Sequence, residues 1–161
     1  MVVGTTIGVM AGYLGGQFDN FFMRLVDVML SFPAVLLAIL IVASLGTGVA
    51  NAIIAITFSL IPTFARMARA LTISLVVDQF VLAAHAIGAT HMRIIGRHIL
   101  PNILAPLIVQ ATAVLAIAIA FASALSFLGL GVEPPTPDWG LMVSEGQRLI
   151  YDALWVPFFP G

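Results

Sequence analysis

The sequence predicts an all-α fold, a polytopic bundle of transmembrane helices with one long polar loop. Composition is the first reason, because 61% of the 161 residues are hydrophobic and only 8% are charged. A mean hydropathy of +1.16 is far from that of a soluble domain. The second reason is a set of long segments without any charged side chain, and the third is the clustering of arginine between two of them. The chain is therefore expected to lie in a bilayer.

The first apolar run covers residues 1–16 and is expected to form part of one span. It has no basic residues at its start, so it does not resemble a cleavable signal peptide. Gly12, Gly15 and Gly16 follow no strand and match no nucleotide-binding fingerprint, and we expect a flexible turn there at the membrane surface. The run begins as if inside a helix, and the chain is expected to be truncated at both ends.

The second apolar run is too long for one span. The 38 positions between Asp27 and Arg66 carry no charge, and one helix of that length would extend about 57 Å against a hydrocarbon core of roughly 30 Å. Two glycines and an asparagine interrupt the run between Gly46 and Asn51. The sequence therefore predicts a hairpin of two spans, at 29–46 and 51–69.

A last uncharged run supplies a further span at 100–126. Ala116, Ala120 and Ala124 recur on it at four-residue spacing, which would let another helix approach closely, although small residues are common in membrane helices in any case. The following segment, 127–157, contains three prolines and a short amphipathic stretch, and is expected to lie along the outer membrane surface.

The distribution of arginine predicts how the chain is oriented in the membrane. The positive-inside rule places the loop at 70–99 and its flanks in the cytoplasm, because they hold most of the arginines while the acidic 127–157 segment falls on the opposite side. The five arginines on the predicted cytoplasmic side are Arg24, Arg66, Arg69, Arg93 and Arg97.

The 70–99 loop is predicted to contain two short helices bent around Gly88. Asp78 can cap a helix that ends at Gly88 in a left-handed conformation, and Thr90 can cap a second helix that leads into the last span. The first helix carries apolar residues that need a protein groove outside the bilayer. These residues are Phe80, Val81, Ala83, Ala84 and Ile87.

This loop resembles the cytoplasmic signature of the permease subunits of binding-protein-dependent ABC importers, which reads EAA, three residues, Gly, nine residues, then I-x-L-P. The matching positions are Leu82, Ala83, Ala84, Gly88, His98, Leu100 and Pro101. Leu82 stands where the signature has Glu, and His98 where it has Ile. Both departures are similar to the dipeptide, oligopeptide and nickel subfamily, as are the segments at 11–33, 64–70 and 125–142.

The resemblance implies the function and the partners. The matching loop residues would couple to a cytoplasmic ATPase, a second permease subunit would complete the pathway, and an extracytoplasmic binding protein would deliver a peptide, or alternatively nickel or another solute. The chain would sit in the prokaryotic plasma membrane as a non-catalytic, multi-pass subunit without a cofactor of its own. ATP and Mg would be bound by the partner, in agreement with the absence of a G-x-x-x-x-G-K-[ST] loop here.

Other classes fit less well. His85, His91 and His98 lack the carboxylate or thiolate neighbours of a metal site, no nucleophile-base set is present for an enzyme, and six arginines without lysine offer no face for nucleic acid. A passive channel or membrane scaffold stays the main alternative from another class. The polar residues expected to line a solute path are Gln110, then Asn51 and Ser59, although helix-to-helix hydrogen bonds would explain each of them equally well.

Overall fold

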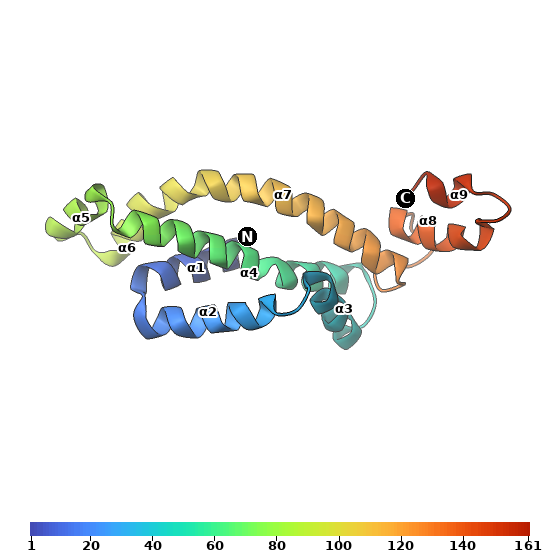
Figure 1. Cartoon of the computed structure of the whole chain (residues 1–161), viewed down its shortest axis with the longest axis horizontal. Helices are drawn as coiled ribbons and strands as arrows, with labels where there is room; N and C mark the ends of the chain where they lie inside the picture. Colours follow the sequence, from blue (N-terminus) through green and yellow to red (C-terminus); the bar gives the residue numbers. More distant parts are fainter. The chain divides into compact units, whose positions relative to one another are not determined.

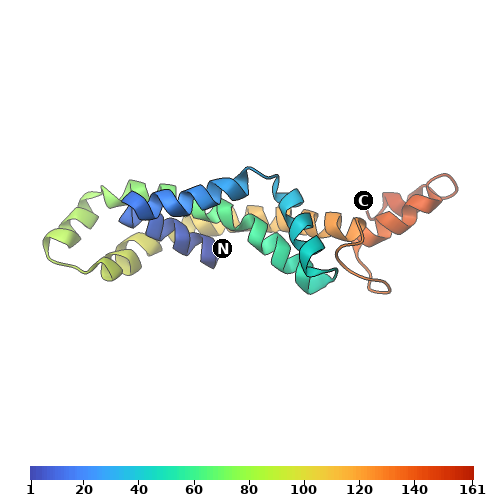
Figure 2. The same cartoon turned by 90° about the horizontal axis from the view of Figure 1, so that it is seen from below.

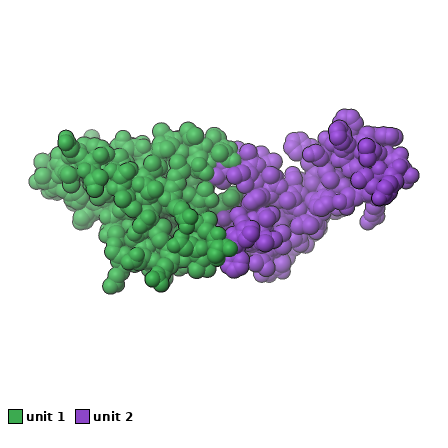
Figure 3. All heavy atoms as spheres, viewed as in Figure 1, with its two compact units in different colours: residues 1–31, 60–113 green, residues 32–59, 114–161 purple.

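The computed structural model describes all residues from 1 to 161. It contains helices and no strand, which confirms the all-α prediction (Figure 1). The chain divides into two compact units, residues 1–31 with 60–113 and residues 32–59 with 114–161 (Figure 3). Each unit is described by itself.

The first unit holds α1 (Val2–Leu14), α2 (Gly16–Leu30), α5 (Gln79–Ala86), α6 (His91–Ile94) and a π-helical turn, η1 (Ile95–Ile99). It also contains the second part of α4 (Val49–Val76) and the first part of α7 (Leu100–Phe127). Figure 2 shows α5 and the turn after it beyond the end of α4, as the green-to-yellow segment. Helix α4 continues to Val76, so the predicted 70–99 loop begins with almost two further helical turns.

Helix α1 packs on α4 through a row of glycines. A Cβ atom added to Gly8 would lie 2.2 Å from the carbonyl oxygen of Ala65, and one at Gly4 would lie 2.5 Å from that of Ile61. Gly12 continues the row, one helical turn further on, and is part of α1. The prediction of a flexible turn is therefore wrong for Gly12. Small residues four apart let two helix backbones approach this closely.

The flexible turn predicted near the end of α1 lies at the next two glycines. Gly15 and Gly16 both have positive φ, at 64° and 57°; Gly15 separates α1 from α2, and Gly16 is the first residue of α2. Glycine populates this region without a Cβ penalty, which explains the residue type at the break.

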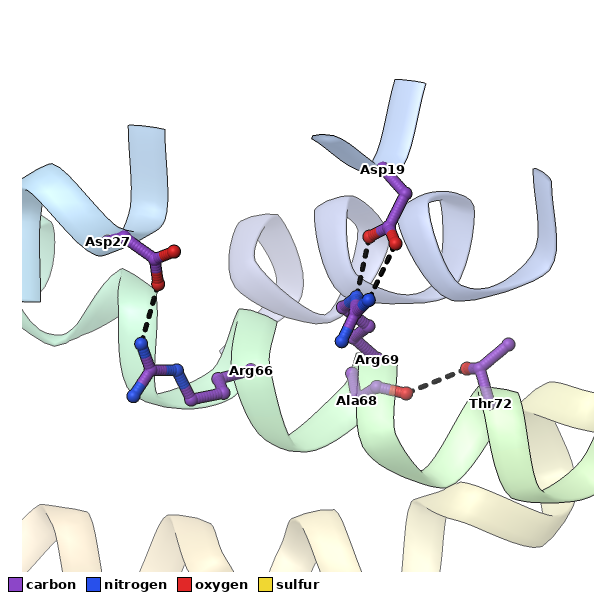
Figure 4. Close-up of polar contacts among 6 residues, drawn as sticks. All are labelled: Asp19, Asp27, Arg66, Ala68, Arg69 and Thr72. Carbon is purple, nitrogen blue, oxygen red and sulfur yellow. Dashed lines mark hydrogen bonds and ion pairs between the residues drawn. The ribbon is translucent and has the colours of Figure 1, made fainter. Parts of the chain in front are cut away.

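Two ion pairs join α2 to α4 (Figure 4). Arg69 makes a two-pronged pair with Asp19, from Nε to Oδ1 at 2.5 Å and from Nη2 to Oδ2 at 2.6 Å. Arg66 Nη2 lies 2.6 Å from Asp27 Oδ1. The cytoplasmic arginines predicted on α4 therefore also hold the unit together.

The second unit holds α3 (Ala34–Leu45), the first part of α4, the last part of α7, and the short helices α8 (Trp139–Gly146), η2 (Gln147–Leu149) and α9 (Trp155–Phe158). The break between α3 and α4 falls at residues 46–48, where the predicted hairpin bends. Gly140 of α8 packs so closely on α7 that an added Cβ would lie 1.9 Å from the carbonyl oxygen of Ser123.

The largest departure of the helices from the predicted spans lies in the 29–46 segment. The predicted 29–46 span begins in the last turn of α2, is interrupted at residues 31–33, and continues as α3, because Pro33 cannot donate the backbone hydrogen bond of a continuous helix. The 12 residues of α3 extend about 18 Å, less than a hydrocarbon core of roughly 30 Å. Two helices, Val49–Val76 and His91–Phe127, are long and apolar enough to cross, and at most three if α2 and α3 count as one broken span. The number of crossings stays a prediction.

Candidate coupling site

Some side chains of α5 face the rest of the protein, and others face solvent. Val81 is fully buried and Ala84 is 5% exposed, so these two face the rest of the first unit. Phe80, Ala83 and Ile87 occur at i, i+3 and i+7 and lie on one exposed face, with Ile87 86% exposed. The prediction that all five apolar residues share an outward surface is therefore wrong for Val81 and Ala84. A partner can reach Phe80, Ala83 and Ile87, here called the outer face of α5.

Gly88 ends α5 in a left-handed conformation, as predicted, with φ at 78°. The amide of Gly88 donates to the carbonyl of His85 at 2.9 Å, and the amide of Ala89 donates to that of Ala84 at 3.0 Å. These two bonds form a Schellman motif, which satisfies the last carbonyls of the helix. No atom lies within 4 Å of a Cβ built on Gly88, so backbone conformation alone requires glycine here.

The return arm of the loop runs without a break into α7. Residues 91–127 form one apolar helical segment that contains the π-helical turn η1 just before Pro101. Pro101 has no N–H to give to a carbonyl one turn back, which disturbs the α-helical ladder there. The Asn102 side chain donates to the carbonyl oxygen of His98 at 2.5 Å, which adds a side-chain hydrogen bond at this turn. The outer face of α5 is thus linked through Gly88 to a long helix.

The three histidines of the loop separate into two places. The ring of His98 lies 6.2 Å from that of Phe80 and packs the return arm against α5. His85 and His91, from opposite sides of Gly88, converge on Tyr13 at the end of α1. The Tyr13 hydroxyl lies 3.2 Å from Nε2 of His85 and 2.8 Å from Nδ1 of His91.

The remaining predicted loop residues lie close by. Leu82 is 55% exposed on α5, Leu100 is half-buried, and Pro101 is exposed in the first turn of α7. Leu100 lines a small hollow together with Thr5 and Met92, between α1 and the return arm. The structure therefore brings the predicted loop positions together at one end of the first unit. Their role in coupling stays a prediction.

The three residues predicted for a solute path lie in different settings. Gln110 lines an open hollow of about 440 Å³ with Arg66 and Thr63. The Asn51 amide donates to the carbonyls of Leu45 and Gly46, both at 3.1 Å, and thereby closes the end of α3.

Ser59 is 4% exposed and bonds back to the carbonyl of Ile56 at 2.9 Å. The amide nitrogen of Asn51 and the hydroxyl of Ser59 thus both bond within the chain.

Sequence reasoning missed Tyr13 and the glycine row. Tyr13 is separated from His85 and His91 by 72 and 78 residues, so no local pattern connects them. The four-residue spacing of Gly4, Gly8 and Gly12 was visible and is the same pattern as the alanine row on the last span.

The fold is thus that of a helical chain with apolar helices long enough to cross a membrane and with a short, partly exposed apolar helix, α5, between two of them. The sequence profile of the family described as binding-protein-dependent transport system inner membrane component matches residues 4–160. The chain belongs to this family. The resemblance noted from the loop signature is thereby confirmed.

Relatives within the family are named for peptide transport. The chain is 49% identical over 161 residues to the dipeptide transport system permease protein of Alkalihalophilus pseudofirmus, covering all of this chain and 53% of that protein. It is 42% identical to the di/tripeptide transport system permease protein of Pseudomonas aeruginosa, again over all of this chain and 53% of the relative. It is 41% identical to the glutathione transport system permease protein of Pectobacterium atrosepticum, over all of this chain and 54% of the relative. The chain spans about half the length of the curated relatives it matches.

Proposed function

We propose that this chain is part of the permease subunit of an ATP-driven importer in the prokaryotic inner membrane, and that di- or oligopeptides are its solute. Family membership supports the transport class, and the names of the relatives support the peptide class. Nickel or another solute of the same subfamily is the alternative within this class. A passive channel or scaffold is the alternative outside it.

The outer face of α5 is the observation that carries the proposal. Phe80 is 41% exposed and Ile87 is 86% exposed, with the small exposed side chain of Ala83 between them. An amphipathic helix that presents anchors at i, i+3 and i+7 binds in an apolar groove of another protein. The groove is proposed to belong to a cytoplasmic ATPase, which binds ATP and Mg, while this chain binds neither and catalyses no reaction.

The long helices on both sides of α5 would transmit its movement. Helix α4 enters the loop at Val76, and the segment from His91 to Phe127 leaves it as one continuous helix. A displacement of α5 by the ATPase would therefore reach the spans with little loss in between. A second permease subunit would complete the solute path, and an extracytoplasmic binding protein would deliver the peptide.

The hollow beside Gln110 is proposed to contact the solute. Its lining combines the Gln110 amide, the Thr63 hydroxyl and the Arg66 guanidinium in one place among apolar residues. Amide and hydroxyl groups can bond the backbone of a peptide, and a guanidinium can bind its carboxylate. Only Nη2 of Arg66 is engaged with Asp27, which leaves its other donors available.

The test is capture of the ATPase encoded nearest to this chain by its full-length form in detergent. Ala83→Asp puts a charge on the outer face of α5 and should abolish capture, because an unpaired carboxylate in an apolar groove is costly. The protein should still be found in the membrane fraction at the wild-type level. If the wild type captured no ATPase, the importer proposal would give way to a channel or scaffold.

Two further variants make the result specific. Tyr151→Asp adds the same charge at a side chain that is 99% exposed in the second unit, and it should leave capture unchanged. Ala84→Asp places the charge at a buried position of α5 and should reduce the amount of folded protein itself. Equal loss of capture in Ala83→Asp and Tyr151→Asp would contradict docking through α5.

A further inference from the structure

The hydroxyl of Tyr13 lies between the two histidines that flank the Gly88 turn. Its oxygen is 2.8 Å from Nδ1 of His91 and 3.2 Å from Nε2 of His85. The rings also pack, with Tyr13 and His85 stacked at an angle of 10° between planes and with His91 edge-on to Tyr13 at 5.6 Å. The cluster therefore combines two hydrogen bonds with aromatic contacts among three side chains.

The hydrogen bonds require a defined arrangement of protons. A phenol has one O–H, which can donate to only one imidazole nitrogen. At least one imidazole must therefore donate its own N–H to the phenolic oxygen. Tyr13 connects the two histidines through its hydroxyl, and removal of the hydroxyl releases both.

The position of Tyr13 is fixed by the packing of α1. Gly8 and Gly12 lie against the backbone of α4, so close that a Cβ at Gly12 would be 2.8 Å from the carbonyl oxygen of Arg69. Tyr13 is the next residue, in the last turn of α1. A helix seated this closely cannot slide without separating from α4, so Tyr13 is a firm point of attachment.

The cluster links both sides of the Gly88 turn to α1 within the first unit. The chain leaves α4 at Val76, passes through α5 and Gly88, and returns in α6 at His91. Tyr13 joins both sides of this turn to α1, which itself rests on α4. Without the Tyr13 hydroxyl the buried side chains of Val81 and Ala84 would still hold α5, but the two histidines beside the turn would lose their hydrogen bonds to α1.

We propose that Tyr13 is a positioning residue for coupling, which ties the Gly88 turn to α1 so that a displacement of α5 also moves α1 and the α4 segment beneath it. The inference rests on the proposed function, because it concerns how docking at α5 is passed on. Tyr13 does not contact the ATPase or the solute. Its hydroxyl acts through His85 and His91.

The first experiment tests the contact itself and does not depend on any partner. The chain contains no cysteine, so in a full-length transporter whose remaining cysteines have been replaced, Tyr13→Cys with His91→Cys gives a single pair. A short bifunctional thiol reagent can bridge this pair across the length of the lost phenol ring. We expect this pair to cross-link, and the matched pair Leu14→Cys with His91→Cys to fail, since Leu14 points about 100° away around the helix. Equal cross-linking of both pairs, or none in the first, would contradict the contact between Tyr13 and His91.

The second experiment measures coupling in the assembled transporter in proteoliposomes. Tyr13→Phe keeps the ring and removes the hydroxyl, so ATPase capture should stay within about twofold of wild type. Solute moved per ATP hydrolysed should fall about three- to tenfold, as expected for the loss of one or two hydrogen bonds. An unchanged ratio would overturn the positioning role, and so would a loss of capture.

A mutant cycle provides the readout that general destabilisation would not reproduce. If the hydroxyl acts through His85 and His91, then adding Tyr13→Phe to a variant with His85→Ala and His91→Ala should cause no further loss of coupling. A further, multiplied loss would show that the hydroxyl acts separately from the histidines and would contradict the inference. If wild type captured no ATPase, the proposed function and this coupling role would both fail. The cross-link would still test the contact between Tyr13 and His91 by itself.

Discussion

Arg69 and Asp19 form a two-pronged ion pair, at 2.5 and 2.6 Å, that joins α4 to α2 (Figure 4). The side chains are 34% and 15% exposed, whereas those of the neighbouring pair Arg66 and Asp27 are 61% and 59% exposed. Both pairs have similar lengths. Their different exposure decides how much each contributes, because solvent screens the second pair far more than the first.

Asp19→Asn is expected to destabilise the protein by about 2 kcal/mol, because it leaves a partly buried guanidinium without its anion. Asp27→Asn should cost less than about 1 kcal/mol, as for other exposed pairs. The thermal stability of the full-length protein in detergent measures both. Equal losses in the two variants would show that exposure does not separate these pairs.

Gly8→Val is expected to separate α1 from α4. Its Cβ would meet the carbonyl oxygen of Ala65 at 2.2 Å, which no rotamer can relieve, and the expected loss is more than about 2 kcal/mol. Gly96→Ala is the matched control, since a Cβ there meets nothing within 4 Å and Gly96 has no positive φ. The amount of folded protein in the membrane and its stability in detergent report the difference. A stable Gly8→Val variant would contradict the close packing.

Gly88→Val is expected to uncouple transport while the protein still inserts. The substitution costs about 1–3 kcal/mol because a β-branched residue is strained at a φ of 78°. Open space around the position rules out a clash as the cause. Gly88→Asn should retain most transport, because asparagine enters the left-handed region more readily. Uptake at the wild-type level by Gly88→Val would refute the role of the turn.

Gln110→Ala and Asn51→Ala are expected to affect different properties, peptide uptake in the first variant and stability in the second. Gln110 lines the open hollow, so its loss should lower uptake of peptide with little change in stability. Asn51 closes the end of α3 with two hydrogen bonds, so its loss should cost about 1–2 kcal/mol of stability and leave the peptide preference unchanged. Competition between peptides during uptake, together with thermal stability, separates these outcomes. A changed peptide preference in Asn51→Ala but not in Gln110→Ala would contradict the assignment of Gln110 to solute contact and of Asn51 to stability.

Several features were predictable because their causes are local. Composition alone identified a membrane chain, and the glycines at 46 and 48 located the break between two helices. Gly88 was predicted to end α5 in a left-handed conformation, and it does. The Asp78 and Thr90 cap positions were also predicted, although neither side chain makes a capping hydrogen bond.

The interruption at residues 31–33 was missed. The predicted 29–46 span runs through Pro33, whereas α2 ends before this residue and α3 begins after it. Proline is tolerated inside α4 and α7, at Pro62 and Pro106. The sequence does not distinguish these cases, because the outcome depends on whether neighbouring groups satisfy the freed carbonyls.

The sequence by itself determined that the chain is helical, that it belongs in a bilayer, and that a bent loop around Gly88 stands between long apolar helices. Apolar content and glycine conformation are properties of single residues and short segments, which explains why they can be read directly. Only the tertiary structure decided that Ala84 faces inward while Ala83 faces outward, and that Tyr13 joins both arms of the loop. The burial of Ala84 depends on tertiary packing, and the Tyr13 contacts join residues more than 70 positions apart, which local pattern does not record.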